Sequence, residues 1–183
     1  MMKLHRIFIA INLPEGIKTK LLEYRNKWPE LPARWTTKEN LHLTLAFLGN
    51  TSDRELAEVC ALLKRAGERH SPFSLAFTKI AYGPDAKRPQ MIWAIGEKSA
   101  ELLALQKDVA STLERTGQPF SPHLTLARLK SFEFQRIEPE EIPEINEEIS
   151  LSFDVKSLEV MESRLRRSGS EYTILQSFVL QSK

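Results

Sequence analysis

The chain has 183 residues, of which 42% are hydrophobic and 27% charged, with a formal net charge of +2. This length suits one large domain or two small joined lobes, and we predict a single bilobal domain over residues 1–183. The weak net charge argues against a nucleic-acid binder that relies on a global positive field, although local charge can still hold a small anion or an RNA end. The single cysteine, Cys60, excludes an internal disulfide and a cysteine-rich zinc module.

No run of the sequence is apolar enough to span a membrane, and the N-terminus begins a strand pattern without the profile of a signal peptide. We therefore expect a cytoplasmic protein that does not engage a membrane. A monomer is the expected oligomeric state.

The first part of the chain alternates strand and helix patterns. Apolar residues recur every second position from residue 6 to 13, and then at helical spacing after Pro14. A strand is expected from residue 41 to about 48, where Gly49 and Asn50 break it. Ser52 and Glu55 have the spacing of a capping box, which predicts a helix from there to about Gly67.

The second part contains more strands than helices. Strands are expected at 73–82 and 90–95, then a helix over 99–115 that Gly117 ends, then a strand from Pro122. The glutamate-rich segment 133–148 is expected to be a surface excursion, and strands at 151–160 and 171–180 to form a hairpin with a long turn. Because several neighbouring strands have no helix between them, we predict an α+β fold with antiparallel or mixed sheets and outer helices.

One short pattern occurs twice, as Leu41-His42-Leu43-Thr44-Leu45 and as Pro122-His123-Leu124-Thr125-Leu126. In a strand, successive side chains point to opposite faces, so each His shares a face with its Thr while the leucines share the other. The repetition, 81 positions apart, indicates a degenerate internal duplication. Two lobes facing each other across a cleft would bring both strands to one composite site.

Two histidines and two threonines at one site suit metal-independent cleavage of a phosphodiester. Imidazole titrates at about 6.5, so one ring can act as general base and the other as general acid. Threonine hydroxyls can hold the phosphate oxygens without competing for the proton. The sequence has no Gly-rich phosphate loop, and no Asp/Glu pair beside either His at metal-ligand spacing. We expect neither a metal nor a cofactor.

The two tetrads, His42-Leu43-Thr44-Leu45 and His123-Leu124-Thr125-Leu126, resemble those of the 2H phosphoesterases. Their flanks, Glu39-Asn40-Leu41, Phe47-Leu48-Gly49, Pro122 and Ala127-Arg128, are similar to a narrower group, the RNA 2′,3′-cyclic phosphodiesterases, also called 2′-5′ RNA ligases. The run from Ser163 through Gly169 and Tyr172 to Leu175 resembles the C-terminal signature of that group.

The resemblance implies a bilobal α+β fold with pseudo-twofold symmetry and a central cleft. It implies hydrolysis of RNA ends or nucleotides carrying a 2′,3′-cyclic phosphate to 2′-phosphates, and leaves open 2′-5′ ligation by the same chemistry. By this likeness His42 gives a proton to the leaving 3′ oxygen and His123 activates water. Thr44, Thr125 and Arg128 would hold the phosphate.

Three of the predicted contacts involve residues outside the two tetrads. Arg128 has the parity of the leucines, so it reaches the phosphate only if the strand ends or bulges after Leu126. Phe8 is the aromatic most suited to stack on a base, since its face of the first strand is otherwise small or polar. Arg164 lies in a basic loop, which either guides an RNA backbone or is a solvated turn. Trp93 is expected in the core.

Two rival functions remain at this point. A non-catalytic module of the same fold would bind cyclic-phosphate RNA ends without turning them over. A metal-dependent hydrolase would lose activity on chelation. Both intact tetrads favour the metal-independent enzyme.

Overall fold

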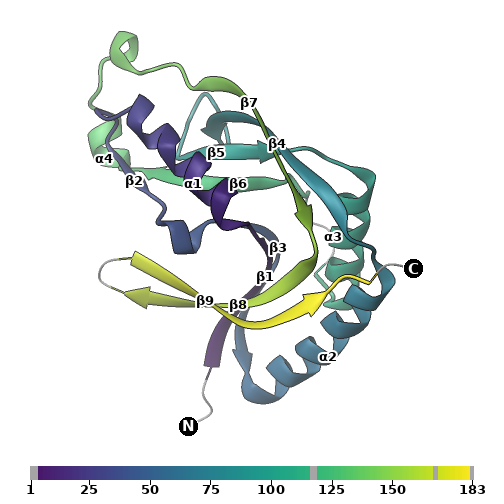
Figure 1. Cartoon of the computed structure of the whole chain (residues 1–183). Coiled ribbons are helices and arrows are strands. Elements are labelled where there is room, and N and C mark those ends of the chain that lie inside the picture. The colour runs from purple at the N-terminus through teal and green to yellow at the C-terminus, as the bar shows by residue number, and fades with distance from the viewer. Residues whose placement is uncertain (1–3, 116–118, 167–168, 182–183) are drawn as a thin grey trace.

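The computed structural model describes residues 4–115, 119–166 and 169–181 and contains two antiparallel sheets with helices packed around them (Figure 1). The described strands are β1 (Leu4–Asn12), β2 (Ala33–Trp35), β3 (His42–Ser52), β4 (Phe73–Gly83), β5 (Met91–Gly96), β6 (His123–Leu129), β7 (Asn146–Val155), β8 (Ser157–Arg166) and β9 (Gly169–Val179). The described helices are α1 (Glu15–Glu23), α2 (Asp53–Arg69), α3 (Ala100–Thr112) and the one-turn α4 (Ser131–Phe134), with 3₁₀ turns η1 (Tyr24–Lys27), η2 (Lys38–Asn40) and η3 (Pro139–Glu141).

Each sheet contains one of the two His-Thr strands. The four-stranded sheet has the order β3-β1-β8-β9, and the five-stranded sheet has the order β2-β6-β5-β4-β7. The α+β architecture with two antiparallel sheets is therefore confirmed. Helices α2 and α3 pack against each other, and they contact strands of both sheets, since α3 touches β3 of one and β4 of the other (Figure 1).

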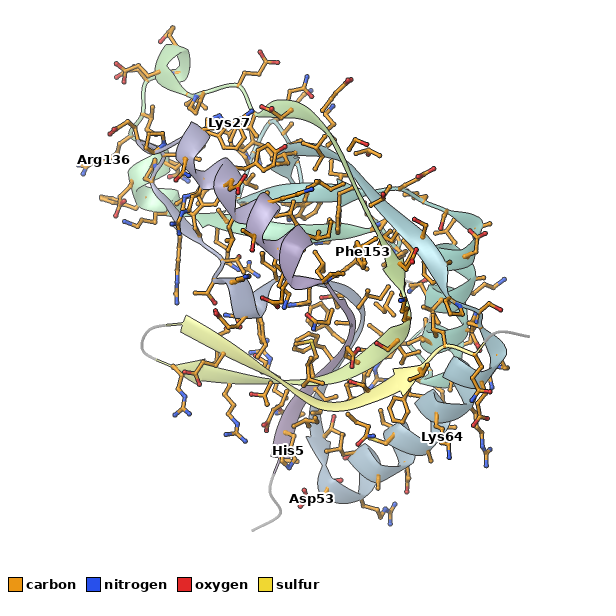
Figure 2. The ribbon with its side chains drawn as sticks, viewed as in Figure 1. His5, Lys27, Asp53, Lys64, Arg136 and Phe153 are labelled. Atoms are coloured by element: carbon orange, nitrogen blue, oxygen red, sulfur yellow. The ribbon has the colours of Figure 1, made fainter. Side chains whose placement is uncertain are left out.

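A single buried apolar cluster connects the two sheets. It includes Ile9 and Leu43 of the four-stranded sheet together with Phe77 and Leu124 of the five-stranded sheet. Phe153 stacks on Phe77 in this core, whereas charged side chains such as Lys64 project outward (Figure 2). The two sheets thus share one core rather than enclosing separate ones.

The predicted elements agree with the structure over most of the chain, although β3 continues through the expected break at Gly49 and Asn50 to Ser52. The capping box is present: the Ser52 hydroxyl accepts from the Glu55 backbone N–H, and the Glu55 carboxylate accepts from the Ser52 backbone N–H at 2.7 Å. Helix α3 begins after its N-cap Ser99, as expected. The predicted stop at Gly117 lies outside the described residues.

The prediction for the C-terminal strands is wrong in detail. The expected strand at 151–160 is two strands, because the chain leaves the five-stranded sheet at Val155 and enters the four-stranded sheet at Ser157. The long turn of the hairpin, expected over residues 163–169, is strand wherever the structure describes it, because β8 pairs with β9 as far as Arg166 and β9 begins at Gly169. Strand β7 also takes in the end of the segment expected to be a surface excursion, and residues 33–35 pair with β6 as β2.

Candidate active site

The two tetrads lie at the starts of β3 and β6, and these strands contact one another where the two sheets meet. The leucines of both tetrads are at most 3% exposed, while each His and each Thr is half-buried on the opposite face. We call this second face, defined by His42, Thr44, His123 and Thr125, the histidine face. The structure brings the two rings close enough for the charge of His123 to lower the pKa of His42.

Both imidazoles are held by the same backbone contact. His42 Nδ1 lies 2.8 Å from the carbonyl oxygen of Asn40, and His123 Nδ1 lies 2.8 Å from the carbonyl oxygen of Ser121. A carbonyl can only accept, so each Nδ1 carries the hydrogen and donates it. In the neutral ring this leaves Nε2 with a free lone pair, which is the form a general base needs.

Burial shifts both rings toward the neutral form. Burial is the main reason that the pKa of His42 is lowered to about 4. The hydrogen bond to the Asn40 carbonyl raises this pKa, but by less than burial lowers it. The positive charges of Lys18 and His123 lower it further. Burial also lowers the pKa of His123, and the positive charge of Arg128 adds to this effect. Near neutral pH the free site therefore holds two uncharged imidazoles, and a bound anion would favour returning a proton to one of them.

Aromatic side chains fix the orientation of each ring. Trp93 stacks on His123 with ring centroids 3.8 Å apart and an interplanar angle of 20°. Phe8 lies 4.8 Å from the His42 ring, and Tyr172 meets that ring edge-on at 5.0 Å. Trp93 was expected in the core; it is instead half-buried beside a histidine. The rings are thus supported from different strands by different aromatic residues.

The structure places Phe8 differently from the expectation of a base-stacking residue. Its side chain is on the histidine face but only 2% exposed. The rings of His42, Phe47 and Tyr172 surround it, with centroid distances of 4.8, 5.9 and 5.2 Å. Phe8 therefore has no free face for a base and acts as packing beneath His42.

Arg128 reaches the histidine face because β6 bulges. Trp93 pairs with Thr125 and Ile92 with Ala127, so Leu126 has no partner on β5. A bulge of this kind inverts the alternation of the residues that follow it. The Arg128 Nη1 and the Thr125 Oγ1 consequently lie at 3.3 and 3.8 Å from the same atom, Met91 Sδ.

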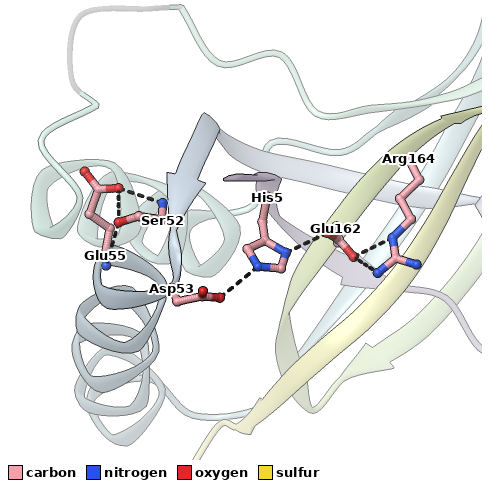
Figure 3. A network of polar contacts seen from close by, with 6 residues as sticks. All are labelled: His5, Ser52, Asp53, Glu55, Glu162 and Arg164. Atoms are coloured by element: carbon pink, nitrogen blue, oxygen red, sulfur yellow. Dashed lines mark hydrogen bonds and ion pairs between the residues drawn. The ribbon is translucent and has the colours of Figure 1, made fainter. Parts of the chain in front are cut away.

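Arg164, by contrast, does not lie on the histidine face. Strand β8 pairs with β1 without a bulge here, so its side chains alternate regularly between the two sides of the sheet. Glu162 and Arg164 are therefore on the same side as the core residue Val160. Met161, which pairs with Phe8, is on the opposite side. The Arg164 guanidinium pairs with Glu162 at 2.8 Å, and Glu162 accepts a hydrogen bond from His5 at 2.7 Å (Figure 3). Arg164 is therefore not one of the side chains that the structure brings together with the two histidines, and its contact with an RNA backbone stays a prediction.

His5 is the centre of that network on the other side of the sheet. Its second ring nitrogen lies 2.9 Å from Asp53 at the start of α2 (Figure 3). His5 is only 7% exposed, so this network joins β1, β8 and α2 within the fold. His5 is thus a structural residue whose two ring nitrogens both have carboxylate partners.

Two residues near His42 have roles that the sequence patterns did not indicate. The Asn40 side chain donates to the carbonyl of Ser170 at 2.7 Å and accepts from the backbone N–H of Tyr172 at 3.1 Å. The same residue therefore anchors His42 through its carbonyl and β9 through its amide. Lys18 of α1 is 4% exposed, pairs with Glu15 at 3.3 Å, and lowers the pKa of His42. The sequence singled out Asn40 only as part of the family-like flank of the first tetrad, and it gave no signal for Lys18.

Within the described ranges, no three His, Cys, Asp or Glu side chains are grouped so that they could hold a metal ion. None of the helices in those ranges is long and apolar enough to cross a membrane.

These features define a two-histidine phosphoesterase, and comparison with known proteins agrees. The model of the family described as LigT like phosphoesterase matches residues 11–93 and again residues 95–172, one His-Thr tetrad in each match. The chain belongs to this family.

Relatives are similar over nearly their whole length. The RNA 2′,3′-cyclic phosphodiesterase of Aquifex aeolicus is 26% identical over 98% of this chain and 99% of its own. The crystal structure of TT0787 of Thermus thermophilus matches with a TM-score of 0.82 and 29% identity over 96% of this chain and 97% of that one. E. coli LigT complexed with 3′-AMP matches with a TM-score of 0.76 and 28% identity over 98% of this chain and all of LigT.

Proposed function

We propose that this phosphoesterase hydrolyses 2′,3′-cyclic phosphates, at RNA ends or on nucleotides, to 2′-phosphates without a metal ion. The observation that carries the proposal is the pair of imidazoles on contacting strands, each with Nδ1 held by a backbone carbonyl and each beside a threonine. The names of the relatives and the nucleotide bound by LigT support the choice of substrate. We further propose that the protein acts as a cytoplasmic monomer.

In the proposed reaction the phosphate occupies the space between His42 and His123. His123 Nε2 takes a proton from water, and the water oxygen attacks phosphorus. The bond from phosphorus to the 3′ oxygen breaks, and His42 gives its proton to that oxygen. The product is a 2′-phosphate with a free 3′-hydroxyl, and a proton exchange with solvent resets the two rings.

The remaining polar groups would stabilise the charge that develops on the phosphate. Among the described residues the Thr44 hydroxyl has no hydrogen-bond partner, and the Thr125 hydroxyl has only the weak acceptor Met91 Sδ at 3.8 Å. Both can therefore donate to non-bridging oxygens. Arg128 adds a positive charge from the same face.

His42 must be protonated before it can act as the acid. Its pKa of about 4 in the free protein disfavours this, mainly through burial. A phosphate monoanion next to the ring favours the imidazolium, so substrate binding would supply the missing stabilisation. Replacement of water by an RNA 5′-hydroxyl would give a 2′-5′ linkage by the same steps, and we include this reaction in the proposal.

The test is incubation of adenosine 2′,3′-cyclic phosphate with the protein in the presence of EDTA. We expect conversion to the 2′-phosphate, and a fall in kcat of about 10²- to 10⁴-fold in both His42→Ala and His123→Ala. Binding without product would instead identify a non-catalytic module, and loss of turnover on chelation a metal-dependent hydrolase.

The assignment of acid and base can be tested separately with a substrate whose 3′ bridging oxygen is replaced by sulfur. A thiolate leaves without protonation, so the loss caused by replacing the acid should shrink while the loss caused by replacing the base should not. We expect His42→Ala to be the partly rescued variant. Rescue of His123→Ala instead would exchange the two roles.

A further inference from the structure

The two halves of the site have bulges at equivalent positions. On β3, Ala10 pairs with Thr44 and Ile9 pairs with Ala46, so Leu45 has no partner on β1. This is the position that Leu126 occupies on β6. In both strands the bulge inverts the alternation, so the third residue after the threonine returns to the histidine face.

The residues brought back by the two bulges differ in chemistry. On β6 it is Arg128, a cation suited to phosphate. On β3 it is Phe47, which pairs across the strands with Phe8 and is 68% exposed. The two halves of the site therefore offer charge on one side and an aromatic ring on the other.

Phe47 lies within one nucleotide's reach of the histidines. The buried Phe8 ring is 4.8 Å from the His42 ring and 5.9 Å from the Phe47 ring, which places Phe47 at most about 11 Å from His42. Phe8 supports Phe47 from below, and the rest of the Phe47 ring is open to solvent. A phenyl ring cannot hold phosphate, but it offers a stacking surface to any base.

We propose that Phe47 forms a base-binding subsite, on which the base of the nucleotide carrying the cyclic phosphate stacks. The inference rests on the proposed function and extends it to the orientation of the substrate. The base lies over the four-stranded sheet, and the phosphate charge is directed toward Arg128 in the five-stranded sheet. Because a stacked phenyl ring offers no hydrogen bonds, this subsite accepts all four bases.

A second exposed phenylalanine provides the matched control. Phe132 on α4 is 72% exposed, but the guanidinium of Arg136 lies over its ring at 4.6 Å. Its ring is therefore partly covered, and it belongs to α4 rather than to either strand that carries a histidine. Phe132→Ala should remove the same side chain from the surface without affecting the substrate.

The experiment compares adenosine 2′,3′-cyclic phosphate with methyl riboside 2,3-cyclic phosphate, which has no base. In Phe47→Ala we expect kcat/KM to fall about 5- to 150-fold for the nucleotide, the range that base stacking on an aromatic ring supplies, and less than about twofold for the base-free substrate. Phe47→Trp should keep the preference for the nucleotide. Phe132→Ala should leave both substrates unchanged.

Two results would overturn the subsite. An equal loss on both substrates would mean that Phe47 only shapes the site, and no loss on either would mean that it does not contact the base. If the wild-type protein turns over neither substrate, the proposed hydrolysis fails instead. In that case calorimetric binding of adenosine 2′-phosphate still decides, because the subsite requires weaker binding in Phe47→Ala than in the wild type and in Phe132→Ala.

Discussion

The lowered pKa values of the His42 and His123 rings make the pH dependence of the proposed reaction a direct test of its mechanism. With a pKa of about 4, His42 in the free protein is protonated in roughly one molecule in a thousand at pH 7, against roughly one in four for an unperturbed imidazole. The proposed reaction needs one charged and one neutral ring. Since the pKa of His123 is also below its usual value, this state becomes rarer as the pH rises above 6.5, by about tenfold for each unit.

The measurement is kcat/KM for adenosine 2′,3′-cyclic phosphate, followed by chromatography of the 2′-phosphate in phosphate-free buffers of constant ionic strength. From pH 6.5 to 8.5 we expect a fall of about a hundredfold. The alkaline limb of kcat should lie at higher pH than that of kcat/KM, because the bound anion stabilises the protonated ring. Circular dichroism across the same range serves as the control for folding.

A value of kcat/KM that stays flat over this range would refute the reasoning. It would mean either that the rings titrate well above 6.5 or that the reaction does not need a charged imidazole in the free protein. Arg128→Met distinguishes these outcomes, because removing this charge should raise the pKa of His123. If a charged ring is needed, the alkaline limb of kcat/KM should move to higher pH in this variant. If no charged ring is needed, the pH profile should not change.

Three further predictions concern stability. Burial opposes the ionisation of Glu162, but its contacts with His5 and Arg164 outweigh this and hold its pKa below the usual 4.5. Its contribution is therefore present above about pH 4.5 and lost as the pH falls through the folded pKa, so Glu162→Gln should lower the urea midpoint at pH 7 and flatten its acid dependence. Gly169→Ala should destabilise the protein by about 1 to 2 kcal/mol in thermal unfolding, because its φ of +128° is a backbone conformation that L side chains rarely adopt, whereas Gly16→Ala, with open space around it, should not destabilise it. Ser52→Ala should cost about 1 kcal/mol in urea unfolding through loss of the α2 cap, and an unchanged midpoint would contradict this.

The sequence patterns were sufficient for the parts of the site that depend on strand alternation. In a regular strand the parity of residues determines their face, so His42 and Thr44 could be placed opposite the leucines before any coordinates. The repetition of the pattern likewise indicated two related halves. Alternation is a local property, which is why it could be read from the residues alone.

The bulges could not be predicted in the same way. Leu126 looks like any strand leucine, and its lack of a partner becomes visible only when β6 is aligned with β5. The sequence left Arg128 undecided for this reason, and gave no signal that Phe47 would share the face of His42. A bulge depends on the register between strands, and register is set by the packing of both partners.

The switch between sheets at Lys156 was missed for a related cause. Residues 151–160 are compatible with strand throughout, and the apolar pattern does not say that the two ends belong to different sheets. Likewise the first strand was correctly divided into two faces, but the side carrying Phe8 is covered by Tyr172 from a distant part of the chain. Contacts of this kind arise only from the tertiary arrangement.

The anchoring of each histidine by a main-chain oxygen has a consequence for how such a protein can change over time. Every residue type has that oxygen, so no single replacement at positions 40 or 121 can delete the acceptor itself. The aromatic neighbours of the two rings, Trp93 on one side and Tyr172 with Phe8 on the other, are entirely different. The side chains around the two rings can therefore differ while the hydrogen bond that holds each Nδ1, and with it the position of the ring proton, is kept.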